Sequence, residues 1–509
     1  MSKNLKVFLM FLAAIISTGV LVARSGNGAG VDDKINAAME PVSNAAVSVI
    51  FYSVEFLGQS IPLVLLWLVA ASCFFTIYFG FINFRYFKYA IQLLFEKAPS
   101  DKKDKKGEIN RFQALSTSVS GTVGLGNIGG VAVAISLGGP GAMIWMIVMG
   151  LIGMTTKFVE ISTAIKYRHR TEEGHFSGGP MYYLTEGFKE RGMPKLGWCL
   201  GAFFSLCCIG GAFGGGNMFQ VNQSFQQFVN VTGGPDASFI ADKGWLFGLF
   251  VSTMVAAVII GGIKSIAAVA SRIVPFMAAL YFFGAMGVII VNAAHIPEAV
   301  VVIFKGAFGL DAVAGGFLGG LIAAMLQGVR RAAFSNEAGL GSASIAHSAV
   351  KTDHHVSQGF VAMLEPFIDT VIICSLTALV IVVSGVYTDN TGMAGVELTS
   401  KAFAETFTWF PYILALAVFL FAFSSMIAWS YYGLKAFTFL FGESEKVETT
   451  YKVMYCMVTV IGGALSLGKI IDFMDAAIFA MTIPNIIGLY VMAPKLKKEL
   501  KEYISERIK

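Results

Sequence analysis

Charged side chains are scarce in this chain of 509 residues. Asp, Glu, Lys and Arg together make up 14% of it, against about 25% in ordinary soluble domains. Hydrophobic residues make up 56%, and the mean hydropathy is +0.70. A soluble fold could not keep so much apolar surface from water. The Lys and Arg residues lie in loops and form no basic stripe interleaved with exposed aromatics, so the sequence argues against a nucleic-acid partner.

Cysteine and histidine are also few, with six of each. The cysteines show neither C-x-x-C spacing nor pairing with the histidines, which disfavours disulfides and metal sites. Near the glycine-rich segments discussed below, the sequence offers no set of nucleophile, base and orienting group, so an enzyme is disfavoured. No cofactor is predicted, and nothing indicates an obligate protein partner.

Apolar sequence, by contrast, is abundant. Runs long enough to cross about 30 Å of hydrocarbon, which takes roughly 20 helical residues, recur along the whole length. The sequence therefore predicts an all-α polytopic membrane protein. We expect eleven transmembrane helices, at residues 62–96, 112–137, 141–166, 196–217, 245–263, 273–292, 313–345, 358–384, 408–440, 452–468 and 470–493.

The two ends of the chain are predicted separately. Residues 1–24 contain an apolar run after Lys3 and Lys6, which fits a signal peptide or an uncleaved signal anchor. Residues 25–61 are amphipathic and are expected outside the cytoplasm. Lys and Arg recur after every second crossing, including the loop 97–111 and the tail 494–509, which predicts that these loops and the C-terminus are cytoplasmic.

One short segment, "GTVGLGNIGG" at residues 121–130, has the spacing G-x-G-x-x-G. That spacing indicates a dinucleotide site only between a strand and a helix, with an acidic residue about 20 positions later. Here it lies within a membrane-length run, without a strand or that acidic residue, so a nucleotide is excluded. Two interpretations remain: close packing of helices, or unwinding that exposes amides to a carboxylate and carbonyls to a hard cation.

The predicted spans 112–137 and 313–345 are both interrupted by glycine and polar residues, and they are five spans apart. Because five is odd, a second unit of five must insert upside down relative to the first. Interrupted segments at matching positions of two halves mark the binding site of secondary transporters. We therefore expect a lead-in helix at 62–96, a first five-helix repeat at 112–292 and an inverted repeat at 313–493.

At this point the residues resemble a known family. Segments such as "SGTVGLGNIGG", "GMTTKFVEISTAIKYR", "GVRRAAFSNEAGLGSASIAHSA" and "FAFSSMIAWSYYG" are similar to the alanine or glycine:cation symporters, and the likeness covers nearly everything from about 60 to 495. The resemblance implies a LeuT-type inverted five-plus-five repeat with two broken helices. In two respects the chain departs from it: Leu125 stands where some members have Thr, and "GGPGAMIWMI" matches the usual family pattern only in part.

The resemblance also implies site residues. The main-chain amides of the first break meet the substrate carboxylate, Gln220 contacts the amino acid, Trp429 closes the side-chain end, and the backbone near Gln327 and Gly328 unwinds in the second broken helix, close to Ser335 and Asn336. The substrate-binding residues expected on this basis are Gly124, Leu125, Gly126, Gln220, Gly328 and Trp429.

For Na⁺, "VGLGN" also resembles neurotransmitter:sodium symporters, which implies an ion held by main-chain carbonyls and a hydroxyl pair. The expected ligands are the carbonyls of Ser120 and Val123 and the hydroxyls of Ser424 and Ser425. Alternatively, the two serines bond back to their own helix. A second ion site is expected at Thr122 and Asn127.

Ionisable residues inside a membrane are candidates for function. Four of them, Arg330, Arg331, Glu365 and Asp369, are expected to pair as an inner gate that breaks when the cavity opens inward. A purely structural ion network would use the same residues.

The function expected from these observations is symport of a small neutral amino acid, alanine or glycine, with Na⁺ by alternating access. The resemblance implies a bacterial inner membrane. Two alternatives remain open: proton coupling with the same substrate, and an amino-acid-gated channel or sensor on the same scaffold.

Overall fold

A computed structural model describes residues 44, 47–56, 59–96, 108–170, 176–310, 316–388 and 395–507. The predicted signal segment 1–24 lies outside the described residues, as do most of the predicted segment 25–61 and residues 97–107 of the basic loop.

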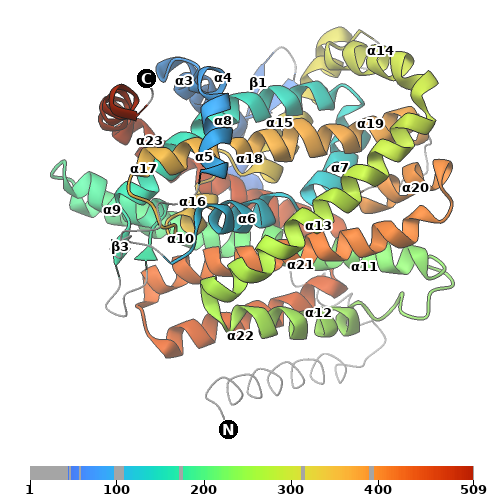
Figure 1. The fold of residues 1–509 in the computed structure, drawn as a ribbon. Coiled ribbons are helices and arrows are strands. Elements are labelled where there is room, and N and C mark those ends of the chain that lie inside the picture. Colours follow the sequence, from blue (N-terminus) through green and yellow to red (C-terminus); the bar gives the residue numbers. More distant parts are fainter. Residues whose placement is uncertain are drawn as a thin grey trace.

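The described chain is almost entirely helical (Figure 1). Its first half contains α3 (Leu63–Tyr78), α4 (Ile82–Arg85), α5 (Phe87–Phe95), α6 (Arg111–Thr122), η1 (Gly126–Gly130), α7 (Val131–Gly138), α8 (Ala142–Lys166), α9 (Pro180–Lys189), α10 (Pro194–Phe213), η2 (Gly214–Met218), α11 (Phe219–Val231), α12 (Gly244–Ile259), α13 (Gly262–Val291), η3 (Ala293–His295) and α14 (Ile296–Ala307).

The second half contains α15 (Gly316–Asn336), α16 (Ala343–His347), α17 (His355–Ala362), α18 (Leu364–Pro366), η4 (Phe367–Cys374), α19 (Ser375–Val383), η5 (Val386–Thr388), α20 (Val396–Thr406), α21 (Phe410–Phe441), α22 (Glu445–Ala464) and α23 (Leu467–Arg507). Two short antiparallel pairs complete the described structure: β1 (Ser53–Phe56) with β2 (Gln59–Pro62), and β3 (His169–Arg170) with β4 (Phe176–Ser177).

Fewer spans than predicted are long, apolar and continuous. Within the described residues, six helical stretches are long and apolar enough to cross a membrane: Ala142–Lys166, Pro194–Val231, Gly262–Val291, His355–Val383, Phe410–Phe441 and Ile470–Arg507. The pair α6 and α7, bent by 47°, adds a seventh. Four predicted spans remain. The span 62–96 divides into α3, α4 and α5, and the span 313–345 is broken after α15. The spans 245–263 and 452–468 correspond to the 16-residue helix α12 and to α22.

Helix α6 lies in the middle of the bundle, where it contacts α13, α16 and α21 (Figure 1). It begins with a capping box: the Asn110 side chain accepts from the Gln113 amide at 2.8 Å, and the Gln113 side chain accepts from the Asn110 amide at 3.1 Å. Residues 114–135 are all buried, although this segment contains the glycine-rich interruption. The interrupted segment is therefore enclosed by protein, as non-helical backbone at membrane depth requires.

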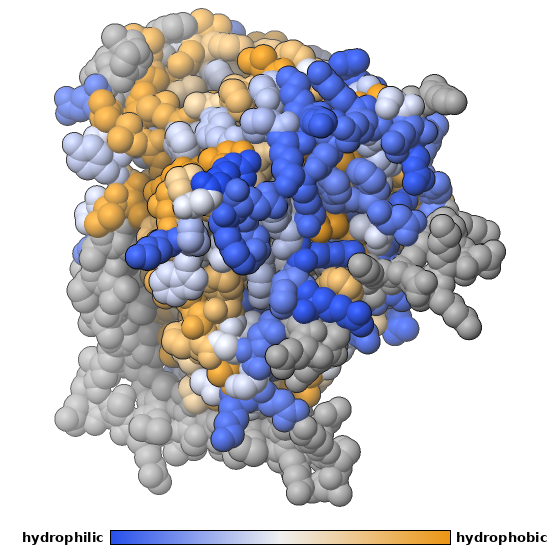
Figure 2. Space-filling view, turned by 90° about the vertical axis from the view of Figure 1, so that its left-hand side faces the viewer, coloured by the Kyte–Doolittle hydropathy of each residue, from blue (hydrophilic) through white to orange (hydrophobic). Residues whose placement is uncertain are grey.

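Helix α23 continues to Arg507, so most of the predicted tail 494–509 is helical. Its last turns are held to the rest of the molecule by polar contacts. Lys495 Nζ lies 2.8 Å from Glu190 Oε2, and the Tyr503 and Tyr89 hydroxyls are 2.9 Å apart. The hydrogen bond from Lys495 lowers the pKa of Glu190. Figure 2 looks onto this end of the molecule, where hydrophilic residues cover much of the surface and hydrophobic residues border them.

Candidate functional site

The first helix break frees two carbonyls at the end of α6. In a regular α-helix the Ser120 and Gly121 carbonyls would accept from the amides of residues 124 and 125. Here both amides bond elsewhere, and two side chains of α21 replace them. Ser425 Oγ donates to the Ser120 carbonyl at 3.0 Å, and Trp429 Nε1 donates to the Gly121 carbonyl at 3.3 Å. The break therefore presents carbonyl oxygens to α21, where Ser425, a predicted Na⁺ ligand, and Trp429, a predicted substrate residue, both lie.

The same break frees two amides, which side-chain amide oxygens satisfy. The Gly124 amide donates to Asn127 Oδ1 at 2.9 Å, and the Leu125 amide donates to Gln220 Oε1 at 3.2 Å. Gln220 is held in turn by the Gly215 carbonyl, to which its Nε2 donates at 2.9 Å. Gly215 lies in the π-helical turn η2, and such turns occur frequently at functional sites. Amides that bond a neutral oxygen here can equally bond a carboxylate oxygen.

Two glycines of the break closely approach neighbouring side chains. A methyl group at position 124 would overlap with Ser425 Oγ and would lie 3.3 Å from Gln220 Oε1. A methyl group at position 126 would lie 3.2 Å from the Phe334 ring. Phe334 also packs edge-on against Phe219. The structure thus brings Ser120, Gly124, Leu125, Gly126, Gln220, Ser425 and Trp429 together, and it adds Phe334.

Three other predicted ion-site residues have different partners. Ser424 Oγ donates to the Phe421 carbonyl of its own helix at 3.0 Å, as in the alternative interpretation of this serine, while its carbonyl accepts from Ser120 Oγ at 2.6 Å. Thr122 Oγ1 donates to the Val119 carbonyl at 3.3 Å. Asn127 Nδ2 donates to Asp369 Oδ1 at 2.7 Å. Of the two serine hydroxyls, only that of Ser425 reaches α6 in these contacts.

The second break lies further along the chain than predicted. Helix α15 runs unbroken through Gln327 and Gly328 to Asn336, and a methyl group at position 328 would clash with the Ala142 carbonyl of α8. The prediction of unwinding at Gln327 and Gly328 was therefore wrong, because this glycine permits close helix packing. The backbone instead leaves helical geometry between α15 and α16, where Glu337, Gly339 and Gly341 have positive φ.

Both breaks contain the tripeptide Gly-Leu-Gly, at 124–126 and at 339–341. At the second break, side chains again complete the backbone hydrogen bonds. Lys157 Nζ donates to the Asn336 carbonyl at 2.9 Å, and Asn485 Nδ2 donates to the Gly339 carbonyl at 2.8 Å. Each break is thus held by side chains from helices distant in sequence, which keeps both non-helical segments fixed within the bundle.

Asp369 connects the two breaks. One carboxylate oxygen accepts from Asn127 of the first break at 2.7 Å, and the other accepts from Ser335, near the end of α15, at 2.8 Å. Thr370 Oγ1 donates to the same oxygen as Ser335, at 2.7 Å. Because Asn127 also accepts from the Gly124 amide, a chain of hydrogen bonds runs from Asp369 to the amides of the first break.

The predicted pairing of the gate residues was wrong. Glu365 lies 3.3 Å from Lys157 Nζ, and it also contacts His347 and accepts from Ser118. Arg331 pairs with Asp475 of α23. Arg330 lies 3.9 Å from the same carboxylate. The reason is orientation: α15 directs its arginines toward α23, whereas Glu365 faces α8 and the end of α6.

Sequence reasoning missed Lys157, Asp475 and Asn485, and also Glu160, which accepts from Asn485 Nδ2 at 2.7 Å. Lys157 and Glu160 interrupt the apolar span 141–166, and Asp475 and Asn485 interrupt the span 470–493. The rule that intramembrane ionisable residues are functional candidates could have singled out three of these four. Phe334 carried no comparable signal, because a phenylalanine in an apolar helix resembles any core residue.

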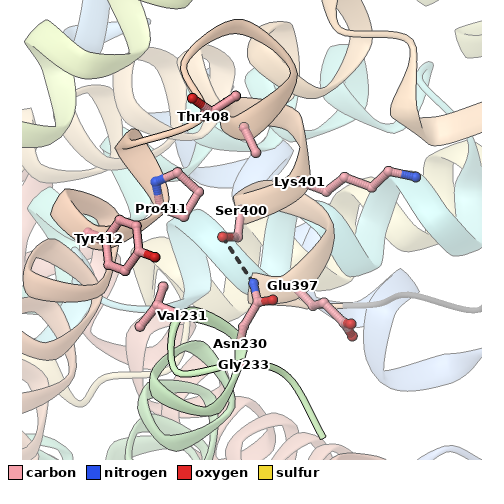
Figure 3. A pocket seen from close by; sticks show the side chains of 10 residues that line it. Asn230, Val231, Gly233, Glu397, Ser400, Lys401, Thr408, Pro411 and Tyr412 are labelled. Carbon is pink, nitrogen blue, oxygen red and sulfur yellow. Dashed lines mark hydrogen bonds between the residues drawn. The ribbon is translucent and has the colours of Figure 1, made fainter. Parts of the chain in front are cut away.

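One end of the first break is covered by α20. Thr399 Oγ1 donates to the Ile128 carbonyl at 3.1 Å, and the Val396 amide donates to Gln223 Oε1 at 2.9 Å. The other face of α20 lines a pocket of about 400 Å³ with the end of α11 and the start of α21 (Figure 3). In that pocket Asn230 donates to Ser400 at 3.2 Å. The helix therefore separates this pocket from the first break.

Comparison with known proteins gives consistent results. A model of the sodium:alanine symporter family matches residues 44–509. The sodium/alanine symporter AgcS of Methanococcus maripaludis is 37% identical over 444 residues, which cover 87% of this chain and 94% of that protein. The probable sodium/glutamine symporter GlnT of Bacillus subtilis is 34% identical over 449 residues, 87% of this chain and 88% of that protein.

The fold is similar to the crystal structure of MhsT in complex with L-phenylalanine. The TM-score is 0.53 with 14% sequence identity, and the match covers 76% of this chain and 89% of MhsT. The chain thus belongs to the sodium:alanine symporter family, and it is a multi-span Na⁺-coupled amino-acid symporter with a LeuT-like fold.

Proposed function

We propose that this protein imports alanine or glycine together with Na⁺ by alternating access, through eleven spans arranged as an inverted five-plus-five repeat with a cytoplasmic C-terminus. The observation that carries the proposal is the first helix break, where amides and carbonyls that have lost their helical partners lie side by side and bond to side chains instead. Amides suit a carboxylate, and uncharged oxygens suit a cation that must be released again. A zwitterion beside Na⁺ satisfies both sets.

In this proposal the substrate carboxylate takes the place of Gln220 Oε1 at the Leu125 amide. The Gln220 side chain then turns toward the bound amino acid, while its amide nitrogen Nε2 still donates to the Gly215 carbonyl. Phe334 and Trp429, both buried, lie beside the break. Two large aromatic rings at this place limit the size of the substrate side chain in the proposal, which favours alanine or glycine over larger amino acids.

The Na⁺ ion is proposed between α6 and α21. Its ligands are the carbonyls of Ser120 and Val123 and the hydroxyl of Ser425, with Ser424 beside them. In this arrangement the ion replaces the hydrogen bond from Ser425 to the Ser120 carbonyl. Because the carbonyls belong to the loop whose amides hold the substrate, ion and substrate stabilise the same backbone conformation. By reciprocal linkage, each ligand then increases the affinity for the other.

Replacing Ser425 tests the ion site directly. We expect Ser425→Ala to raise the Na⁺ concentration for half-maximal alanine uptake roughly tenfold or more, since one bond to a charged group contributes about 1.5–3 kcal/mol. Ser424→Ala is the matched control, because its hydroxyl bonds within its own helix. Uptake into proteoliposomes at varied Na⁺ measures both. If both variants raise the Na⁺ concentration for half-maximal uptake equally, Ser425 is not a specific ligand of the ion.

The coupling ion is tested with the wild-type protein. In proteoliposomes with a fixed pH gradient, replacing external Na⁺ by choline should abolish concentrative alanine uptake. Undiminished uptake in choline would instead identify the proton as the coupling ion.

Two further measurements address the channel alternative and the substrate. A symporter accumulates alanine against its own gradient, whereas a channel only lets the two alanine concentrations become equal. Competition of glycine and glutamine with alanine uptake then ranks the substrates.

Alternating access requires the break to open to each side in turn. On the side predicted to face outward, α20 covers the break, so outward opening requires α20 to move away from Ile128 and Gln223. On the predicted inner side, the contact of Lys157 with Glu365 joins α8 to α18. Arg331 joins α15 to Asp475 near the start of α23, the end of that helix predicted to face outward. We propose the Lys157–Glu365 pair as a contact that rearranges during inward opening and the Arg331–Asp475 pair as one that rearranges during outward opening.

A further inference from the structure

A basic pocket lies where the turn after α3 meets the last turns of α23. Its volume is about 500 Å³, within the roughly 300–1,000 Å³ typical of ligand sites. The walls come from the end of α3, from α4 and from the C-terminal part of α23. These elements lie together at the upper left in Figure 1, on the end of the molecule seen in Figure 2. The pocket is far along the chain from both helix breaks and contributes no residue to them.

Three cations line this pocket: Arg85, Lys497 and Lys501. The residues described as lining it include no Asp or Glu. Two neighbouring lysines of α23 have acidic partners that balance their charge: Lys495 pairs with Glu190, and Lys498 lies 4.0 Å from Glu502. The positive charge of the pocket is therefore concentrated at one place, whereas Lys495 and Lys498, nearby on the same helix, have acidic partners.

The side chains of two of these cations are positioned by aromatic rings. Lys497 Nζ lies 3.9 Å from the centre of the Tyr78 ring, and the Arg85 guanidinium lies 5.6 Å from that of Tyr86. Arg85 also donates to the Gly80 carbonyl at 3.5 Å. Ser505 adds a hydroxyl to the lining. This arrangement of donors fits the oxygens of a phosphate group.

The surroundings of the pocket are apolar. Ile77, Leu500 and Ile504 line it. Ile77 is 67% exposed, and Phe81 and Phe84, from the same turn and helix α4, are 49% and 59% exposed. Phe81 has φ of 56°, an uncommon conformation for a large residue. Large exposed apolar side chains next to Lys and Arg are typical of the boundary between hydrocarbon and headgroups. The predicted topology places this boundary on the cytoplasmic side, where anionic lipids attract basic residues.

We propose that this pocket binds the headgroup of an anionic phospholipid. The headgroup phosphate contacts Arg85, Lys497 and Lys501, and the acyl chains lie along the exposed apolar residues beside them. Because the pocket is shared by the α3–α4 turn and the end of α23, the bound lipid ties these two segments together. Charge complementarity selects an anionic over a zwitterionic headgroup, and the apolar rim selects a lipid over a free phosphate ion.

The test compares purified full-length proteins in detergent micelles. The altered protein is Arg85→Gln/Lys497→Gln/Lys501→Gln, and the matched control is Lys189→Gln/Lys446→Gln/Lys498→Gln, which removes equal charge from the same predicted side. Native mass spectrometry counts bound phosphatidylglycerol, and thermal unfolding is followed with added phosphatidylglycerol, phosphatidylcholine or inorganic phosphate. We expect phosphatidylglycerol to bind to and stabilise both the wild type and the control. The affinity of the altered protein for this lipid should be lower by about tenfold or more.

The other outcomes overturn the proposal. If wild type and altered protein bind phosphatidylglycerol equally, the lipid does not bind in this pocket. If the control loses as much phosphatidylglycerol binding as the altered protein, the lipid is attracted to the basic surface in general. Equal stabilisation by phosphatidylcholine removes headgroup selectivity, whereas equal stabilisation by inorganic phosphate identifies a free anion as the ligand. If the triple variant does not fold, Lys501→Gln alone, at an exposed position, is compared with Lys498→Gln by the same measurements.

Discussion

Gly124→Ala should reduce Na⁺-dependent alanine uptake by roughly 10- to 100-fold. The added methyl group overlaps with Ser425 Oγ and crowds Gln220 Oε1, and inserting a methyl into a tightly packed site typically costs 1–3 kcal/mol. The overlap can be relieved only if Ser425 rotates or if the loop moves. The first removes a proposed Na⁺ ligand and the second moves the amides proposed for the carboxylate, so either change disables the site.

Uptake into proteoliposomes, with protein amount measured by immunoblot, checks this effect. Gly287→Ala in α13 is the matched control, because its methyl group would meet its nearest neighbour, the Phe407 ring, at an ordinary 3.5 Å. The double variant Gly124→Ala/Ser425→Gly removes the overlap and should recover substrate binding while Na⁺ affinity stays weak. Wild-type uptake by Gly124→Ala would contradict the proposed position of the ion and the substrate.

The second large effect concerns Lys157, which is fully buried with Glu365. Lys157→Met leaves the Glu365 carboxylate with His347 and Ser118 alone and leaves the Asn336 carbonyl without its Lys157 donor. Removing one partner of a buried ion pair typically costs 3–5 kcal/mol. We expect a clearly lower unfolding temperature in detergent and loss of alanine uptake, because the second break loses the donor that holds its first carbonyl.

The double variant Lys157→Met/Glu365→Gln separates charge from position. With the carboxylate neutralised, stability should return in part, whereas uptake should stay low because the Asn336 carbonyl still lacks its Lys157 donor. Lys189→Met serves as control, since Lys189 pairs with Glu186 at the surface, where ion pairs contribute little. An unfolding temperature of Lys157→Met equal to that of wild type would show that the buried pair does not hold the break.

Much of the first break was predictable because the relevant signal is local. Glycine spacing inside an apolar run predicts a broken helix at Gly124 and Gly126, and the structure has that break. The prediction of the second break was wrong for an equally local reason. Gly328 and Gly339 lie in the same interrupted span, and the local sequence does not show which of them marks the break. Only tertiary contact separates them, since Gly328 faces the Ala142 carbonyl of α8 while Gly339 adopts positive φ.

Composition and hydropathy determined by themselves that this chain is a helical membrane protein, and the residue pattern around Gly124 located its first break. The partners of buried charges were decided only by the fold. Two such pairs, Arg331 with Asp475 and Lys157 with Glu365, join residues more than a hundred positions apart in sequence. A buried charge pairs with whichever opposite charge the packing of helices brings within reach. Periodicity predicts which face of a helix is buried, but it does not say which helix that face meets.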